Sequence, residues 1–158
     1  MSEDRPSWDL LAYRLPREPS TPRIALWRRL RRLGAVQLVD GLVALPHNPA
    51  NLEQLEWAAE EVTEAGGAAT LWLATSTSKA QDRALAERIR TVAAADYLTV
   101  AEAAQTAASG ASSGRRRTLR RLRRALRAID ARAHYRPPEA EQAHDAVERL
   151  AELIEVTT

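Results

Sequence analysis

The sequence predicts an α+β fold, in which a four-stranded antiparallel sheet with two helices on one face precedes a helical extension. Short apolar runs of strand length alternate with amphipathic helical patterns in the order β-α-β-β-α-β over residues 7–76. An Asp40-Gly41 pair between two apolar runs is typical of a tight hairpin. Beyond this point only helical spacing remains, so we expect one domain over residues 1–76 and a helical extension over residues 77–158.

Prolines separate the first strand from the first helix. The apolar run over residues 8–15 ends at Pro16 and is typical of a buried strand. Ser20 or Thr21 can cap the following helix, because either hydroxyl accepts hydrogen bonds from free backbone N–H groups. Gly34 is expected to end it, since glycine tolerates a left-handed backbone. The apolar stripe of this helix consists of Leu26, Leu30 and Leu33.

The next segment completes the sheet. Strands over residues 35–39 and 42–45 flank the Asp-Gly turn. Asn51, with a glutamine three residues later, predicts a capping box at the start of a helix over residues 52–65. A fourth strand is expected over residues 68–75. The resulting order of elements is the split β-α-β arrangement, so the sequence predicts a ferredoxin-like sheet.

The C-terminal half is expected to be helical. A long Ala-rich helix over residues 79–107 is followed by a Ser/Gly-rich segment at 109–114, which is typical of a flexible linker or loop. An Arg-rich helix over residues 115–132 comes next. A Pro-Pro pair then breaks the chain before an acidic helix over residues 139–155. The apolar seam of the Arg-rich helix is Leu119, Leu122, Leu126, Ile129 and Ala133.

Charge is segregated along the chain, although the formal net charge is only +2 and 22 of the 23 basic side chains are Arg. Residues 115–132 hold nine Arg and one acid, whereas residues 139–158 hold six acids and one Arg. The basic helix either follows a nucleic-acid backbone or pairs with the acidic helix folded back beside it. Because nine exceeds six, a cationic patch remains in both cases. The candidate nucleic-acid-binding residues are Arg116, Arg117, Arg120, Arg121, Arg124 and Arg127.

The remaining arginines and the tryptophans have structural interpretations. In the first helix, we expect ion pairs between Arg28, Arg31 or Arg32 and the second-helix acids Glu56, Glu60 or Glu64. Stacking platforms for single strands need exposed aromatic rings beside cations. The four Trp instead lie on elements that should be partly buried, and Trp72 is expected at an open sheet face as an interface residue. The tryptophans are Trp8, Trp27, Trp57 and Trp72.

Several function classes are disfavoured by the composition. The chain has no Cys, which excludes disulfides and thiolate chemistry. Its three histidines, His47, His134 and His144, show no metal-ligand spacing, and no phosphate loop or catalytic motif occurs. We therefore expect no enzyme activity, no metal and no cofactor. With no secretion signal or membrane span in the sequence, a cytoplasmic location without a membrane partner is expected.

Residues 10–46, LLAYRLPREPSTPRIALWRRLRRLGAVQLVDGLVALP, carry a resemblance to a known family. In this run Leu-Pro closes the first strand, Ser-Thr-Pro-Arg opens the helix, and the hairpin again ends on Leu-Pro. It resembles the N-terminal domain of ChrB proteins, and the likeness continues more weakly through Leu73 and residues 119–153. More distantly it is similar to the central ferredoxin-like domain of PaaX-type repressors. The resemblance implies a regulator or accessory protein of chromate resistance, in which a separate C-terminal domain follows.

These observations lead to three hypotheses. The first is a non-enzymatic, DNA-binding transcriptional regulator of the chromate-resistance class, expected to be a homodimer. The second is a protein-interaction module that dimerises or docks a separate ChrB C-terminal-type partner without binding DNA. The third is a metal-dependent nuclease of the ferredoxin-like type found in CRISPR adaptation. Such enzymes place an acid at the end of the first strand, where this chain has Arg14, whereas Asp9 lies at the opposite end, so this hypothesis is not favoured.

Overall fold

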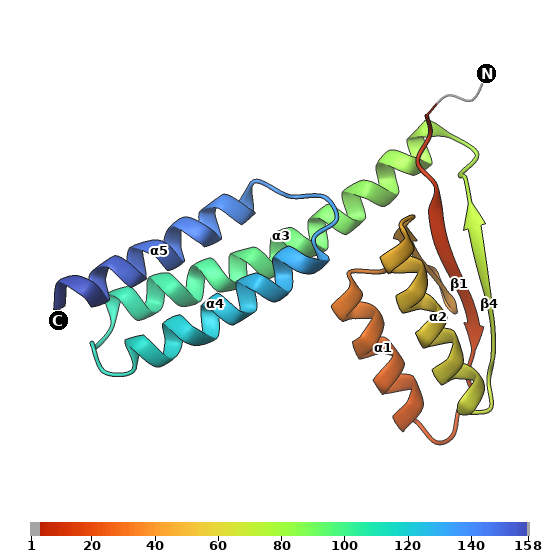
Figure 1. Cartoon of the computed structure of the whole chain (residues 1–158), viewed down its shortest axis with the longest axis horizontal. Helices are drawn as coiled ribbons and strands as arrows, with labels where there is room; N and C mark the ends of the chain where they lie inside the picture. The colour runs from red at the N-terminus through yellow and green to blue at the C-terminus, as the bar shows by residue number, and fades with distance from the viewer. Residues whose placement is uncertain (1–3, 158) are drawn as a thin grey trace. The chain divides into compact units, whose positions relative to one another are not determined.

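The computed structural model describes residues 4–157, and these form two compact units. The first unit extends to Arg88 and the second begins at Ile89. Their boundary lies inside α3 (Lys79–Ser109), which contributes its first turns to the first unit and the rest to the second (Figure 1). The domain boundary expected after residue 76 precedes this helix and stays a prediction.

The first unit is built on a four-stranded antiparallel sheet with the order β2-β3-β1-β4. The strands are β1 (Trp8–Arg14), β2 (Val36–Val39), β3 (Leu42–Pro46) and β4 (Ala68–Ala74). The strand β3 lies between β1 and β2, and β1 lies between β3 and β4, so both β-α-β units are split. The predicted α+β fold is confirmed, and its order of strands and helices fits a ferredoxin-like arrangement.

Two helices cover one face of this sheet (Figure 1). They are α1 (Thr21–Leu33) and α2 (Pro49–Glu64). Each presents one apolar stripe to alternate residues of the strands, which point to the same face because the side-chain period of a strand is two. The buried side chains of this core are Leu11, Leu26, Leu30, Val43, Leu45, Leu55, Ala58 and Val62.

Glycine is required at the tip of the β2–β3 hairpin. Gly41 has a φ of 77°, in the left-handed region that favours glycine. A Cβ atom there would lie 2.5 Å from the carbonyl oxygen of Tyr13, whose backbone N–H donates to the Gly41 carbonyl at 2.7 Å. The Asp-Gly turn therefore also fixes the end of the central strand.

The start of α2 differs from the prediction. Asn48, not Asn51, is the capping residue, and its Oδ1 accepts a hydrogen bond from the backbone N–H of Asn51 at 2.7 Å. The helix starts earlier because Pro49, which has no N–H to satisfy, fits its first turn. The Asn51 side chain is buried and donates to the carbonyl of Pro46 at 2.7 Å, so it ties the helix to β3.

The prediction of partial burial was wrong for Trp27 and Trp57, whereas Trp72 was expected at an open sheet face and its interface role stays a prediction. Trp8 is buried, and its Nε1 donates to Asp82 Oδ1 at 3.1 Å. Trp27, Trp57 and Trp72 are 57%, 56% and 59% exposed. Trp27 and Trp57 are exposed because the buried stripes of their helices consist of other residues, mainly leucine and alanine. Trp72 is exposed because β4 is an edge strand.

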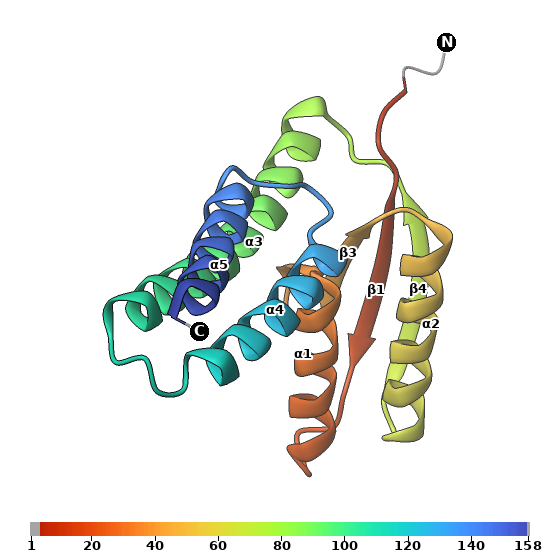
Figure 2. The ribbon, with the colours of Figure 1, turned by 60° about the vertical axis from the view of Figure 1, so that its left-hand side comes forward.

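The second unit consists of the remainder of α3, α4 (Arg115–Arg132) and α5 (Glu139–Thr157). The three helices lie side by side around an Ala- and Leu-rich core (Figure 2). The seam predicted for the Arg-rich helix is confirmed for Leu119, Leu122, Leu126 and Ile129, which are buried, while Ala133 follows the helix and is partly buried. The buried side of α3 in this unit runs through Ile89, Ala93 and Tyr97, while Val92 is 44% exposed. Among the described residues, no helix is both long and apolar enough to cross a membrane.

Candidate nucleic-acid interface

The helix α4 has an apolar side and an arginine side. Its four buried apolar residues recur at spacings of three and four and pack into the core of the second unit. The arginines between them fall on the opposite side and are exposed. We call six of them the arginine face: Arg117, Arg120, Arg121, Arg123, Arg124 and Arg127. From the first to the last, this face extends about 15 Å along the helix axis.

The arginine face is not neutralised within residues 4–157. None of its six guanidinium groups forms an ion pair or a side-chain hydrogen bond with another described residue. The acidic helix α5 packs beside α4 through alanine, valine and leucine. Its carboxylates therefore do not pair with the arginine face. The charge pattern left open whether the arginines of α4 pair with the acidic helix. The described contacts show no such pairs, so the cationic surface stays unpaired.

Arginines at the two ends of α4 have partners inside the second unit. The Arg115 guanidinium donates to the carbonyls of Ala107, Ala108 and Gly110 at 3.1, 3.0 and 2.8 Å, so it satisfies two carbonyls in the last turn of α3 and one just after the helix. Arg132 pairs with Asp96 at 2.9 Å. Arg116, one of the predicted binding residues, is exposed but also has an interaction within the chain. These three are therefore outside the arginine face.

The single acid of α4, Asp130, interacts with Tyr97 and His144 and not with the arginine face. Asp130 accepts a hydrogen bond from the Tyr97 hydroxyl at 2.6 Å and lies 3.0 Å from Nε2 of His144. Burial would raise the pKa of Asp130, but these two hydrogen bonds outweigh it and lower the pKa. Burial, followed by the hydrogen bond to Asp130, raises the pKa of Tyr97 to about 12. Through Tyr97, Asp130 and His144 this cluster joins α3, α4 and α5.

A buried carboxylate, which the sequence pattern did not predict, lies at the start of β1. Asp9 is fully buried, with its Oδ1 atom 2.7 Å from Nδ1 of His47 and its Oδ2 atom accepting from the backbone N–H of Asn48 at 3.3 Å. The pair fixes the loop that enters α2. The one sequence signal for this site is an aspartate inside an apolar strand pattern, because a buried carboxylate needs hydrogen-bond partners.

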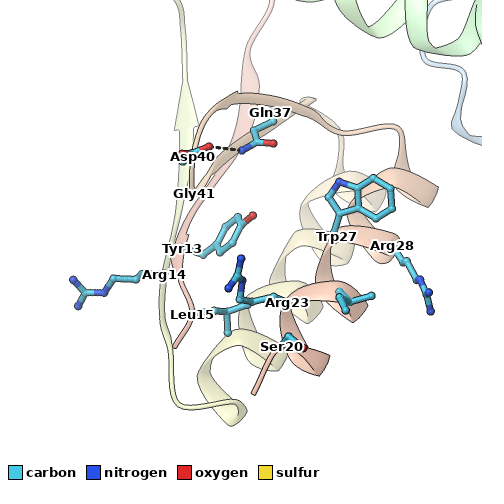
Figure 3. Close-up of a pocket in the computed structure, with 11 residues that line it drawn as sticks. Tyr13, Arg14, Leu15, Ser20, Arg23, Trp27, Arg28, Gln37, Asp40 and Gly41 are labelled. Carbon is cyan, nitrogen blue, oxygen red and sulfur yellow. Dashed lines mark hydrogen bonds between the residues drawn. The ribbon is translucent and has the colours of Figure 1, made fainter. Parts of the chain in front are cut away.

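A groove with a volume of about 860 Å³ lies between α1 and the tip of the β2–β3 hairpin. In Figure 3, Tyr13, Arg23 and Trp27 point into this space, while Arg14 and Arg28 point away from it at its borders. Near the hairpin, Gln37 Nε2 donates to Asp40 Oδ1 at 3.3 Å. The groove thus combines two aromatic rings, guanidinium groups and one carboxylate.

The ion pairs expected between α1 and α2 were placed wrongly. The pair that forms joins Arg29 and Glu61, on the sides of the two helices that face each other. Arg31 instead lies over the ring of Trp27, with its Cζ atom 5.6 Å from the ring centroid. Three arginines of α1 (Arg28, Arg31 and Arg32) stay exposed and form no ion pair with any described residue.

Comparison with known proteins identifies the family. The family described as "Protein ChrB, N-terminal" matches residues 23–109, which is more than half of the chain. The chain belongs to this family. It is 33% identical over 92 residues to protein ChrB of Cupriavidus metallidurans, in an alignment that covers 55% of this chain and 28% of that protein. No solved structure matches the chain. The family match covers most of α1 and all of α2 and α3 and ends before α4, so the arginine face lies outside the matched residues.

Proposed function

We propose that this ChrB-family chain is a non-enzymatic, DNA-binding component of a regulator of chromate resistance. The observation that carries the proposal is the exposed arginine face of α4, which has no carboxylate partner among the described residues. A phosphate backbone supplies the negative charge that α5 does not supply. Guanidinium groups bind phosphate oxygens through paired N–H donors, and each phosphate contact releases bound counterions.

The arginine face suits contact with the DNA backbone better than reading of bases. Its arginines cover a wide arc of the helix, and most protein–DNA hydrogen bonds go to phosphate and sugar. We therefore expect binding to duplex DNA that depends little on sequence and strongly on salt. Sequence preference would come from elements that this surface does not include.

The test is duplex binding by fluorescence anisotropy at low salt, with the variant R120A/R121A/R124A. We expect its affinity to fall by about tenfold or more, because three phosphate contacts are removed. The matched control is R28A/R31A/R32A, which removes the same charge from α1. The proposal fails if the natural chain does not bind a duplex at low salt, or if the control loses as much affinity as the α4 variant.

A second candidate function, assembly through the sheet, is favoured by the outer edge of β4. This strand, AATLWLA, has no charge and no proline, and both Trp72 and Leu73 are more than half exposed. The opposite edge is protected, since β2 is short, carries a register irregularity and has its Gln37 carbonyl occupied by the Arg88 guanidinium. Long uncharged edges without such devices are where strands of another chain add.

We propose that β4 pairs antiparallel with β4 of a second copy. In such a dimer, α1 and α2 of both copies lie on the same face of the joined sheet. Each residue of β4 must then lie opposite a residue of the second copy whose side chain points to the same face. The pairing centred on Leu71 meets this condition and gives all seven residues a partner. It places Ala69 opposite Leu73 and Thr70 opposite Trp72, so small side chains face large ones.

Light scattering after size-exclusion chromatography tests this assembly. The natural chain is expected at twice its mass of 17.5 kDa, and L73E at the monomer mass, because two carboxylates would enter the interface. V39E is the control, as Val39 on the β2 edge is 62% exposed against 63% for Leu73. A monomeric natural chain, or a monomer produced equally by V39E, would contradict the pairing.

A further inference from the structure

The groove beside α1 is lined by an exposed indole ring, that of Trp27, and by the guanidinium group of Arg23. Trp27 is 57% exposed, and in Figure 3 its ring, the Arg23 guanidinium and the Tyr13 phenol point into the same opening. We propose that this groove binds a nucleotide with an unpaired base, which stacks on Trp27 while its phosphate lies at Arg23. The inference is independent of duplex binding by α4.

The indole is suited to stacking. A base gains favourable contact with an aromatic ring whatever its sequence, because every base has a π-face. The ring is already polarised by the Arg31 guanidinium, whose Cζ atom lies 5.6 Å from its centroid. Trp57 is equally exposed, at 56%, but does not line this groove, so it serves as a matched control for Trp27.

The charges of the groove orient the ligand. Arg14 and Arg28 border it and add positive potential near Arg23. Asp40 is the single acid among the described lining residues and lies at the hairpin end beside Gln37. A carboxylate repels phosphate and accepts hydrogen bonds from the amino group of a base. The phosphate therefore lies toward Arg23, and the edge of the base lies toward Asp40 and Gln37.

Tyr13 supplies a hydrogen-bond donor at neutral pH. Burial, and then the nearby Asp40 carboxylate, raise the pKa of its phenol above the ordinary value. Its hydroxyl therefore stays protonated and can donate to a phosphate or sugar oxygen. The volume of about 860 Å³ lies in the usual range of ligand sites and is open enough for a nucleotide that is either free or part of a strand.

Nuclear magnetic resonance of the indole N–H groups of the full chain tests the site, because the four tryptophans give separate signals. The probes are AMP, a single-stranded hexamer of deoxyadenylate, and inorganic phosphate. We expect AMP to shift the Trp27 signal and phosphate alone to leave it in place. In calorimetry, W27A and R23A should each weaken nucleotide binding by about tenfold, whereas W57A should not.

The outcomes also identify the source of the nucleotide. A hexamer that binds more than tenfold tighter than AMP indicates an unpaired strand, and similar affinities indicate a free nucleotide. The inference is overturned if neither AMP nor the hexamer moves the Trp27 signal, if phosphate alone moves it as far, or if W57A weakens binding as much as W27A. Duplex binding by W27A should stay at the natural level, which separates this result from failure of the α4 proposal.

Discussion

At the scale of single residues, the first unit depends on a carboxylate that gathers donors from distant parts of the chain. Asp82, in the first turn of α3, accepts hydrogen bonds from Arg5, Ser76 and Trp8. The hydrogen bonds from Ser76 and then Arg5 lower its pKa from 3.8 to about 2. The folded state therefore holds this proton less tightly than the unfolded chain does, and stability is linked to pH through this group.

We predict that D82N loses this linkage. The stabilisation by Asp82 is complete above about pH 4, where the unfolded chain is ionised too, and is lost as the pH falls toward about 2. Thermal unfolding from pH 2 to 7 should show a lower melting temperature for D82N at neutral pH, with the two proteins converging near pH 2. D145N, on the exposed side of α5, is the control. A constant difference at all pH values would contradict the assignment.

The Tyr97–Asp130 hydrogen bond gives a second prediction at this scale. The phenol is buried and its partner is charged, so Y97F should destabilise the second unit by about 1 to 3 kcal/mol. Because the hydrogen bond holds down the pKa of Asp130, that pKa should rise in the variant. Urea unfolding measures the first effect, and carboxyl NMR titration measures the second. An unchanged Asp130 pKa would show that the hydroxyl does not control it.

At the scale of elements, helices with strong periodicity could be predicted from the sequence, and details that depend on tertiary contacts could not. The spacing of leucine and arginine in α4 predicted both the buried seam and the exposed arginines, because both follow from 3.6 residues per helical turn. The cap of α2 was misplaced, since Asn48 and Asn51 both fit the local signals and only β3 decides which one is buried. The partners of Arg29 and Asp130 likewise depend on packing between helices.

The seam of α4 should hold the second unit together. Leu122 is 2% exposed at the centre of the helix, so L122A is expected to cost about 2 to 5 kcal/mol through lost burial and the cavity left behind. R123A, the exposed neighbour, should change stability by less than about 0.5 kcal/mol. Urea unfolding followed by circular dichroism at helix wavelengths measures both. Equal effects of the two substitutions would contradict the assigned faces.

At the scale of the whole molecule, charge segregation was visible in the sequence, but its consequence was not. The sequence showed nine Arg followed by six acids and left their pairing open. In the structure, α5 contacts α4 through small apolar residues, which leaves the acids and the arginine face on separate surfaces. The tryptophan positions were also beyond local patterns, because burial of Trp27 or Trp72 depends on which neighbour covers them.

Phosphate binding by the arginine face is tested most directly by the salt dependence of duplex binding, measured as the slope of log affinity against log salt concentration. Each phosphate contact contributes about 0.9 to this slope. If the arginine face binds the DNA backbone, R120A/R121A/R124A should reduce the slope by about 2 to 3 relative to the natural chain. The R28A/R31A/R32A control should keep the natural slope. Identical slopes for the natural chain and the α4 variant would contradict the claim that this surface meets phosphate.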